Sequence, residues 1–297
     1  MSKLCLYNEE GVFVKRLYVI CLCLCLVGCA PSTIEEETIA DSDITIGCAP
    51  YISAIVMSNL AKEILGQKGY VADIEILENV DLYENLSRNK VGATVSAWFY
   101  DKDYIIYESI KDKVEDLGSS CEYLTKGLAV PEYVDVAEIS ELNMYRAKFN
   151  DIIYCFDEIP LLYELTKKAN TVYDLDYKLV KISEQEIDKN LEDAIKKGEW
   201  IVFSGYIPHW FFAKYNLRFL ADTEIVFEGQ QEIHTLVNKN LETEDKEIYN
   251  ILDGFYLYKE ELNDLLYEVD KAGIDNLNKT VFEWLIKNND VASRNQR

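Results

Sequence analysis

The residues of this chain that could bind a ligand are most concentrated in one stretch, Trp200–Leu220, which holds two of the four tryptophans and one of the two histidines. Aromatic faces attract cations that lack N–H donors, because the ring quadrupole is negative above the ring plane. An imidazole can donate a hydrogen bond to a carboxylate. Tyr206 and His209 therefore suit a small ligand that carries a cation and a carboxylate.

A second aromatic candidate, Trp98, comes from a distant part of the sequence. It follows the apolar run Val91–Ala97, as Tyr206 follows Trp200–Gly205, and both runs predict strands. Ligands of open α/β sheets lie beyond the carboxyl ends of the strands, so closure of a cleft could bring the two rings together. The spacing alone is equally compatible with packing roles for both rings and with a structural role for His209.

Catalytic chemistry finds little support in the sequence. The motifs Gly-x-Ser-x-Gly and His-Glu-x-x-His and the P-loop are absent. A surface hydrolase could pair Cys155 with His209, but nothing in the spacing selects that pair. A metal-uptake protein would have only His209 and His234 beyond the amino-terminal segment, too few for a His-rich site. We expect a binding protein that is not an enzyme, with no cofactor and no metal.

The charge balance restricts the class of partner. The chain has 53 acidic and 30 basic residues and a formal net charge of −23. Phosphate binding needs clustered Lys and Arg, so a nucleic-acid partner is not expected. The acid excess predicts a solvated, soluble surface.

The amino terminus has the pattern of an export signal. Lys15 and Arg16 precede the apolar run Leu17–Val27, which is too short to span a bilayer. The sequence Leu26-Val27-Gly28-Cys29 resembles the bacterial lipobox, and this resemblance implies lipidation of Cys29. We therefore expect a signal peptide over residues 1–28 and a flexible tether over 29–42, followed by a domain on the extracytoplasmic face of the cell membrane.

Beyond the tether, strand and helix patterns alternate, which predicts parallel β–α units in two lobes, with a helical tail. The predicted strands are Ile44–Gly47, Ala72–Leu77, Val91–Ala97, Gly127–Val130, Ile152–Phe156, Tyr177–Ile182 and Trp200–Ser204. The predicted helices are Ile52–Leu65, Asp81–Lys90, Tyr104–Val114, Leu161–Ala169, Ser183–Gly198, Asp245–Leu252, Lys259–Lys271 and Lys279–Lys287. A helix is predicted to restart at Pro208 after a break at Gly205.

An ordered series of motifs resembles one family, the glycine betaine, proline betaine and choline substrate-binding proteins of ABC transporters. The stretch Ser204–Leu217 resembles that family's Gly-Trp-x-Pro-His-Trp-x-Phe-x-x-Tyr-x-Leu signature. Four further segments follow the family's order, and the resemblance covers about residues 43–290. These segments are Ser96–Trp98, Lys113–Gly118, Gly127–Asp135 and Glu232–Val237.

The resemblance implies an α/β fold, a two-lobed periplasmic-binding-protein (type II) clamp with mixed sheets and a helical C-terminal segment. It places a substrate-binding domain over residues 43–297. Lobe I would cover about 43–140 and 226–297, and lobe II about 141–225. The implied function is capture of a small quaternary-ammonium or zwitterionic compatible solute of the glycine betaine type. The implied partners are this ligand, the permease subunits of an ABC importer, and the membrane through the lipid anchor.

The resemblance also implies a binding site. Trp98 and Tyr206 match walls of an aromatic cage around a trimethylammonium group, and His209 matches a donor to the ligand carboxylate. Ala54 and Ile55 match backbone donors, in a place where a helix N-terminus would favour an anion. Tyr51 lies next to them and could add a ring.

Three departures from the family pattern bear on the ligand. Tyr206 stands where the family usually has Trp, and Phe99-Tyr100 replaces Leu-Pro. In the family's glycine-rich segment this chain has Cys155–Pro160, where Phe156 and Glu158 could fill space for the ligand. The alternative is therefore a protein of the same fold with a changed ligand, such as an amino acid or another small zwitterion, or a sensor without a transport role.

Overall fold

The structure is a computed structural model that describes residues 42–98, 102–157, 159–227 and 231–295. These residues belong to one unit, Ala40–Arg297. The signal peptide expected over 1–28, Cys29 and nearly all of the tether expected over 29–42 lie outside the described residues, as do Phe99, Tyr100 and Glu158.

The first half of the sheet begins with parallel strands joined by helices. Strand β1 (Ile44–Cys48) pairs in parallel with β2 (Ala72–Ile76) and β3 (Ala93–Trp98). A parallel pair needs a long crossover, and α1 (Ile52–Gln67) and α2 (Asn79–Ser87) supply it. Apart from its terminal Trp98, β3 is buried, as expected of a strand covered on both faces.

The second half of the sheet has its own parallel centre. Strand β5 (Ile152–Phe156) pairs in parallel with β6 (Lys178–Ile182) and with β7 (Phe203–Ile207). Three helices belong to this half: α4 (Pro160–Val172), α5 (Glu184–Lys197) and α6 (Phe211–Lys214). Helix α5 begins with the capping box expected from its sequence, in which Ser183 and Glu186 bond each other's backbone N–H groups.

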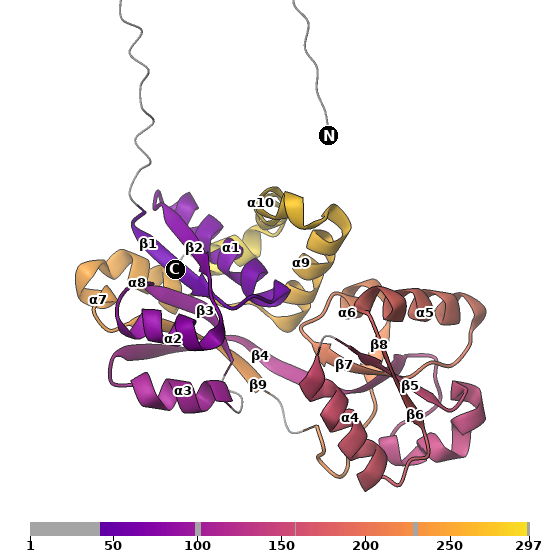
Figure 1. The fold of residues 1–297 in the computed structure, drawn as a ribbon. Coiled ribbons are helices and arrows are strands. Elements are labelled where there is room, and N and C mark those ends of the chain that lie inside the picture. The colour runs from indigo at the N-terminus through magenta and orange to yellow at the C-terminus, as the bar shows by residue number, and fades with distance from the viewer. Residues whose placement is uncertain (1–41, 99–101, 158, 228–230, 296–297) are drawn as a thin grey trace, which may run out of the picture. The chain divides into compact units, whose positions relative to one another are not determined.

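One long strand, β4 (Val114–Pro131), belongs to both halves (Figure 1). Its first part pairs antiparallel with β9 (Gln231–Asn238) as far as Leu124, and from Thr125 onward it pairs antiparallel with β7. Its end also pairs with β8 (Leu217–Phe219). The register of β4 against β9 shifts three times between Asp116 and Leu124. The resulting order is β2-β1-β3-β9-β4-β7-β5-β6.

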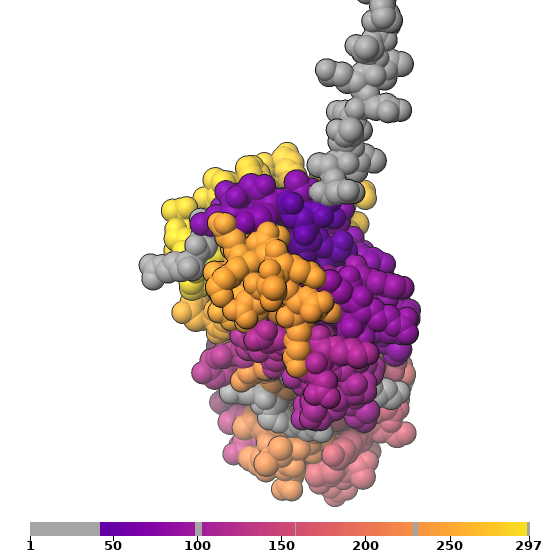
Figure 2. Space-filling view, turned by 90° about the vertical axis from the view of Figure 1, so that its left-hand side faces the viewer, coloured from indigo at the N-terminus to yellow at the C-terminus, as the bar shows by residue number. Residues whose placement is uncertain are grey.

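Helices fill the chain after β9, which confirms the expected helical C-terminal segment. They are α7 (Leu241–Glu244), α8 (Lys246–Asp253), α9 (Lys259–Ala272), α10 (Leu277–Lys287) and α11 (Asn289–Arg294). Helices α9 and α10 pack on α1, and the orange α7–α8 segment lies on the surface in Figure 2. Among the described helices, none is long and apolar enough to cross a membrane.

Several predicted elements need correction. The predicted parallel units are only part of a mixed sheet, because β4, β8 and β9 pair antiparallel with their neighbours. The strand predicted over Gly127–Val130 is the end of the 18-residue β4. Strand β9, the strand β8 and a 3-10 helix, η1 (Ile139–Phe149), were not predicted.

The predicted break at Gly205 is wrong. Strand β7 continues through this residue to Ile207, and helix α6 begins at Phe211 instead of Pro208. Gly205 pairs with Gly127 of β4, and a Cβ atom at residue 205 would lie 3.2 Å from Cβ of Ala129 and 3.3 Å from the Phe203 ring. The glycine therefore permits a close approach inside the sheet rather than ending a strand.

Candidate ligand-binding site

A cavity of about 380 Å³ lies among residues from both halves of the sheet, a volume that suits a small ligand. The first half contributes two rings and three polar side chains, and the second contributes a ring, apolar side chains and a lysine. The lining residues are Tyr51, Ser53, Asn79, Trp98, Asp103, Lys126, Ile159, Leu161, Leu162 and Tyr206.

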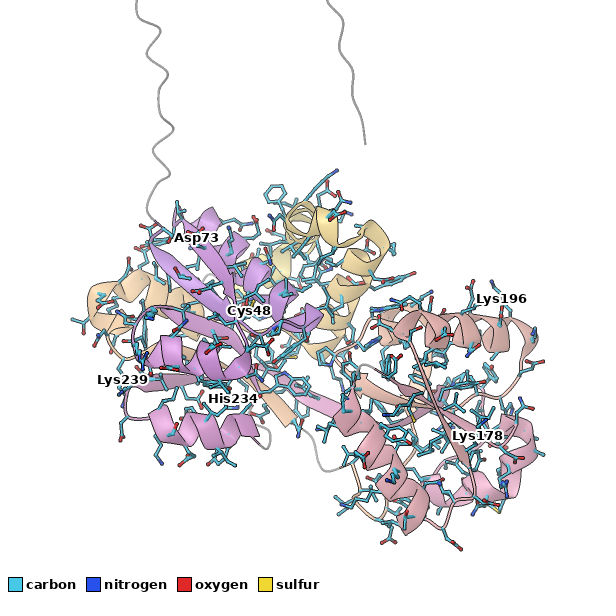
Figure 3. The ribbon with its side chains drawn as sticks, in the orientation of Figure 1. Cys48, Asp73, Lys178, Lys196, His234 and Lys239 are labelled. Carbon is cyan, nitrogen blue, oxygen red and sulfur yellow. The ribbon has the colours of Figure 1, made fainter. Side chains whose placement is uncertain are left out.

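Trp98 and Tyr51 reach the cavity from the ends of adjacent parallel strands. Trp98 is the last residue of β3 and is half-buried. Its Nε1–H is buried and meets no acceptor among the described residues. Tyr51 stands just before α1 and three residues after the buried Cys48, which ends β1 (Figure 3). Trp98 therefore lies at a strand end and lines the cavity, and its role in binding stays a prediction.

Tyr206 enters the cavity from β7, opposite Lys126 of β4. Two rings support it from behind. Phe156 makes an edge-to-face contact at 5.8 Å between centroids, and His209 does so at 4.9 Å. Phe156 is 2% exposed and is not among the lining residues, so it packs under Tyr206 instead of filling the cavity.

His209 lies in the loop between β7 and α6 and is 3% exposed. Its Nδ1 accepts a hydrogen bond from the Phe211 N–H at 3.2 Å, and its Nε2 lies 3.5 Å from a carboxylate oxygen of Glu184. Its backbone N–H donates to Oδ1 of Asn263 on α9 at 3.0 Å. The ring is held by protein groups and is not among those that line the cavity.

Glu184 is the charged partner of this histidine. Burial raises the pKa of Glu184, but hydrogen bonds from His209 and Trp210 outweigh burial and bring the pKa below its ordinary value. The Trp210 Nε1–H donates to the Glu184 carboxylate at 2.5 Å. This network connects α5 to the loop that carries His209.

The two expected backbone donors lie in the first turn of α1. The Ile55 N–H donates to the Tyr51 carbonyl at 3.1 Å, whereas the Ala54 N–H has no acceptor among the described residues. The neighbouring Ser53 lines the cavity. The first N–H groups of a helix lack intrahelical partners and carry partial positive charge, so this end of α1 favours an anion.

Sequence reasoning missed four polar residues of the cavity: Ser53, Asn79, Asp103 and Lys126. Asp103 lies in the first turn of α3 (Lys102–Ile110), and both of its carboxylate oxygens accept from Nδ2 of Asn79, at 3.1 and 2.9 Å. The Lys126 ammonium donates to Oε1 of Gln231 at 3.0 Å. Asn79 follows the end of β2, and Asp103 follows the end of β3. The strand-end rule, applied to polar residues as well as aromatic ones, would have found both.

The charge of Asp103 acts on two phenols on this side of the cavity, in addition to burial. Burial, followed by the charge of Asp103, raises the pKa of Tyr51, although that residue is 37% exposed. The same two causes raise the pKa of Tyr83, which is fully buried nearby. Both phenols, neutral at physiological pH like any tyrosine, therefore stay neutral at higher pH as well.

Cys155 and His234, the candidates for hydrolysis and for metal binding, lie outside the cavity lining. The Cys155 thiol is buried, and burial raises its pKa to about 11, which keeps it protonated and poorly nucleophilic at neutral pH. His234 lies on β9 (Figure 3), where its Nδ1 is 2.9 Å from the Asp116 carboxylate. Neither residue lines the cavity.

Comparison with known proteins identifies the family. The family described as the substrate binding domain of ABC-type glycine betaine transport system (OpuAC) matches residues 42–287. The chain belongs to this family. It is 31% identical over 132 residues to the glycine betaine/carnitine transport binding protein GbuC of Listeria monocytogenes, a match that covers 43% of either chain.

Solved structures of OpuAC-type proteins agree with this assignment. The glycine betaine, L-proline-binding protein ProX of Borrelia burgdorferi is 30% identical, with a TM-score of 0.64, 84% of this chain covered and 95% of that one. The lactococcal OpuAC, in its closed conformation with glycine betaine, gives a TM-score of 0.67 at 23% identity, with 86% and 100% covered. The latter likeness concerns the fold alone.

Family membership confirms the fold class and the broad function. The mixed α/β sheet with C-terminal helices is the periplasmic-binding-protein fold expected from the sequence. OpuAC proteins are solute-binding components of transport systems and not enzymes, so this chain is a substrate-binding protein of an ABC-type system.

Proposed function

We propose that this OpuAC protein captures a small quaternary-ammonium or zwitterionic compatible solute, of the glycine betaine type, and delivers it to the permease subunits of an ABC importer. The observation that carries the proposal is that Trp98 and Tyr206, which are far apart in the sequence, line one cavity together with Tyr51. Each favourable aromatic face contributes about 0.5–2 kcal/mol to binding of a cation. A quaternary ammonium gains most from such walls, because it has no N–H to donate.

The carboxylate end of a betaine-like ligand is proposed to meet the N-terminus of α1 at Ala54 and Ile55, with His209 as a further donor. Support is strongest for Ala54, whose N–H lacks an acceptor among the described residues. The Ile55 N–H can donate to the ligand carboxylate only if it leaves the Tyr51 carbonyl. The His209 ring can do so only if it leaves the Glu184 carboxylate.

Binding is proposed to close two lobes, with lobe I over about residues 43–140 and 226–297 and lobe II over about 141–225. The change of partner strand along β4 and the lining of the cavity by both halves support this motion. In such hinge systems the closed form differs in surface from the open form, which gives a permease something to recognise.

The location is proposed to be the extracytoplasmic face of the membrane, with a lipid on Cys29. The support is the apolar run Leu17–Val27 and the lipobox-like Leu26-Val27-Gly28-Cys29. Replacement Cys29→Ala should prevent lipidation and release the protein from the membrane fraction. A Cys29→Ala protein that stays with the membrane and keeps the lipid mass would refute the anchor.

Intrinsic tryptophan fluorescence of the detergent-solubilised full chain tests the ligand. It should be titrated with glycine betaine, proline betaine, carnitine, choline and proline. A saturable change with a quaternary ammonium is the expected result. A response to proline or another amino acid alone would show the changed-ligand alternative. Binding without uptake in cells would indicate a sensor.

A further inference from the structure

Helix α9 makes a buried contact with the loop that follows the strand of Tyr206. The Oδ1 atom of Asn263 on this helix accepts a hydrogen bond from the His209 N–H at 3.0 Å. Asn263 is 6% exposed and His209 is 3% exposed, so the bond is shielded from water. Helix α9 packs on α1 of the first half of the sheet, whereas the loop joins β7 to α6 in the second half. The bond therefore connects the two halves in addition to the strand β4.

Stacked rings accompany this hydrogen bond. Tyr267 lies four residues after Asn263, on the same side of α9. Its ring stacks with that of Trp210, which follows His209 in the loop, at 6.5 Å between centroids and 12° between planes. Trp210 is buried, and helix α6 also contacts α9. His209 and Trp210 are therefore both packed against α9, which anchors the loop.

His209 passes this anchoring on to a wall of the cavity. Its buried N–H would be costly without an acceptor, so Asn263 restricts where the His209 backbone can lie. Its ring is fixed within the second half by the Phe211 N–H and the Glu184 carboxylate. The same ring supports Tyr206 edge-to-face at 4.9 Å between centroids, and Tyr206 lines the cavity. A continuous series of contacts therefore runs from Asn263 through His209 to Tyr206.

We propose that Asn263 is a positioning residue for the ligand, because it fixes His209 and thereby holds the Tyr206 ring at the cavity. Asn263 is not among the lining residues, so its effect on binding passes through Tyr206. This inference rests on the proposed function, because it takes the cavity to be the solute site. Under the proposed boundaries, α9 belongs to lobe I and Tyr206 to lobe II. The affinity for the ligand therefore depends on how the two lobes meet at this contact, and not only on the side chains that touch the ligand.

A double-mutant cycle between Asn263 and Tyr206 tests the inference. The full chain in detergent should be titrated calorimetrically with glycine betaine and with choline. Asn263→Ala should weaken binding by about three- to tenfold, the range for loss of one ordinary hydrogen bond. In a Tyr206→Ala background the same substitution should change the affinity by about twofold or less, because the ring that Asn263 positions is absent. An equal loss of affinity in both backgrounds would overturn the inference.

Two further variants guard the result. Asn263→Leu keeps the branching at Cγ but cannot accept a hydrogen bond, and it replaces Asn263→Ala in the cycle if the alanine protein does not fold. Asn238→Ala removes another buried amide, whose Nδ2 donates to the Leu86 carbonyl at 2.8 Å. It should lower the Tm yet leave the ligand affinity unchanged within about twofold in both backgrounds.

The outcome for the wild type separates this inference from the proposed function. If the wild type binds glycine betaine or choline and Asn263→Ala binds it equally well, the inference is overturned and the proposed function stands. If the wild type binds no quaternary ammonium compound, the proposed function is removed and this inference with it.

Discussion

The ring of His209 meets the ring of Tyr206 edge-to-face, with 4.9 Å between centroids and 78° between planes. Tyr206 lines the cavity, while His209 is buried behind it and contacts Glu184 through Nε2. The histidine thus supports a wall of the candidate site in this conformation. Its proposed role as a donor to the ligand would require the ring to exchange Glu184 for the ligand carboxylate.

Trp98→Ala should weaken binding of a quaternary ammonium by about 1–3 kcal/mol, from a lost cation–π contact and lost apolar burial. Fluorescence is a poor readout for a variant that lacks a tryptophan, so calorimetry should measure this affinity. Phe282→Ala, on an exposed face of α10, is the control and should change nothing. An unchanged affinity in Trp98→Ala would remove that residue from the site.

Tyr206→Trp introduces the residue that the family usually has at this position. It should strengthen binding of a quaternary ammonium by about two- to fivefold, because Trp gives the best cation–π face. Tyr206→Ala should weaken it. Phe156 lies under Tyr206 at 5.8 Å and limits how a larger ring can settle. A Tyr206→Trp protein that folds normally yet loses affinity would contradict the expected gain from the larger ring face.

Lys126 and His209 are the two candidate side chains for binding a ligand carboxylate. Lys126 lines the cavity and His209 does not. If the ammonium of Lys126 serves this role, Lys126→Met should weaken glycine betaine by about tenfold and choline much less, as expected for one charge-assisted hydrogen bond. If His209 moves to the ligand, His209→Ala should show that selectivity instead. If each variant loses as much affinity for choline as for glycine betaine, neither side chain binds the ligand carboxylate.

Acid should destabilise the protein partly through Glu184. Its folded-state pKa is lowered, so the unfolded chain binds more protons, and the stability from this group is present above the unfolded pKa of about 4.3. That contribution is lost as the pH falls through the folded pKa. In thermal melts from pH 7 to pH 3, Glu184→Gln should therefore show a smaller decline in Tm than the wild type. Glu164→Gln, at an exposed position on α4, should reproduce the wild-type decline.

Gly205→Ala should lower the free energy of unfolding by about 1–3 kcal/mol, because the new methyl group would be forced against the Ala129 and Phe203 side chains. Gly66→Ala is the matched control. It lies in α1 with nothing within 4 Å of the new methyl group, and should stabilise by about 0.5–1 kcal/mol through helix propensity. Chemical denaturation measures both. Equal stability of Gly205→Ala and the wild type would mean that the sheet relaxes around this position.

The sequence drew attention to two aromatic residues of the cavity, because large rings directly after apolar runs are conspicuous. Trp98 and Tyr206 indeed line the same cavity. Asp103 and Asn79 escaped notice because a polar residue near a helix start normally reads as a cap or a solvated first turn. Both residues follow strand ends, and the contact of α2 with α3 brings their side chains together.

Most helices and the parallel strands were predicted because their apolar periodicity is local. Strands β8, β9 and most of β4 were not, since β4 pairs with β9 more than a hundred residues later and mixes polar with apolar side chains. Gly205 was misread for a related reason. Its meaning depends on Gly127 across the sheet, which no local pattern contains.

The passage of β4 through both halves has a consequence for engineering. Because this strand is paired with β9 up to Leu124 and with β7 from Thr125, neither half of the sheet can be moved as an independent unit. A chimera that grafts the second half onto a relative must cut or import β4, and either choice breaks hydrogen-bond ladders in the recipient. Ligand preference in this protein should therefore be transplanted by single side chains at the cavity, such as Trp98 and Tyr206, and not by exchange of whole lobes.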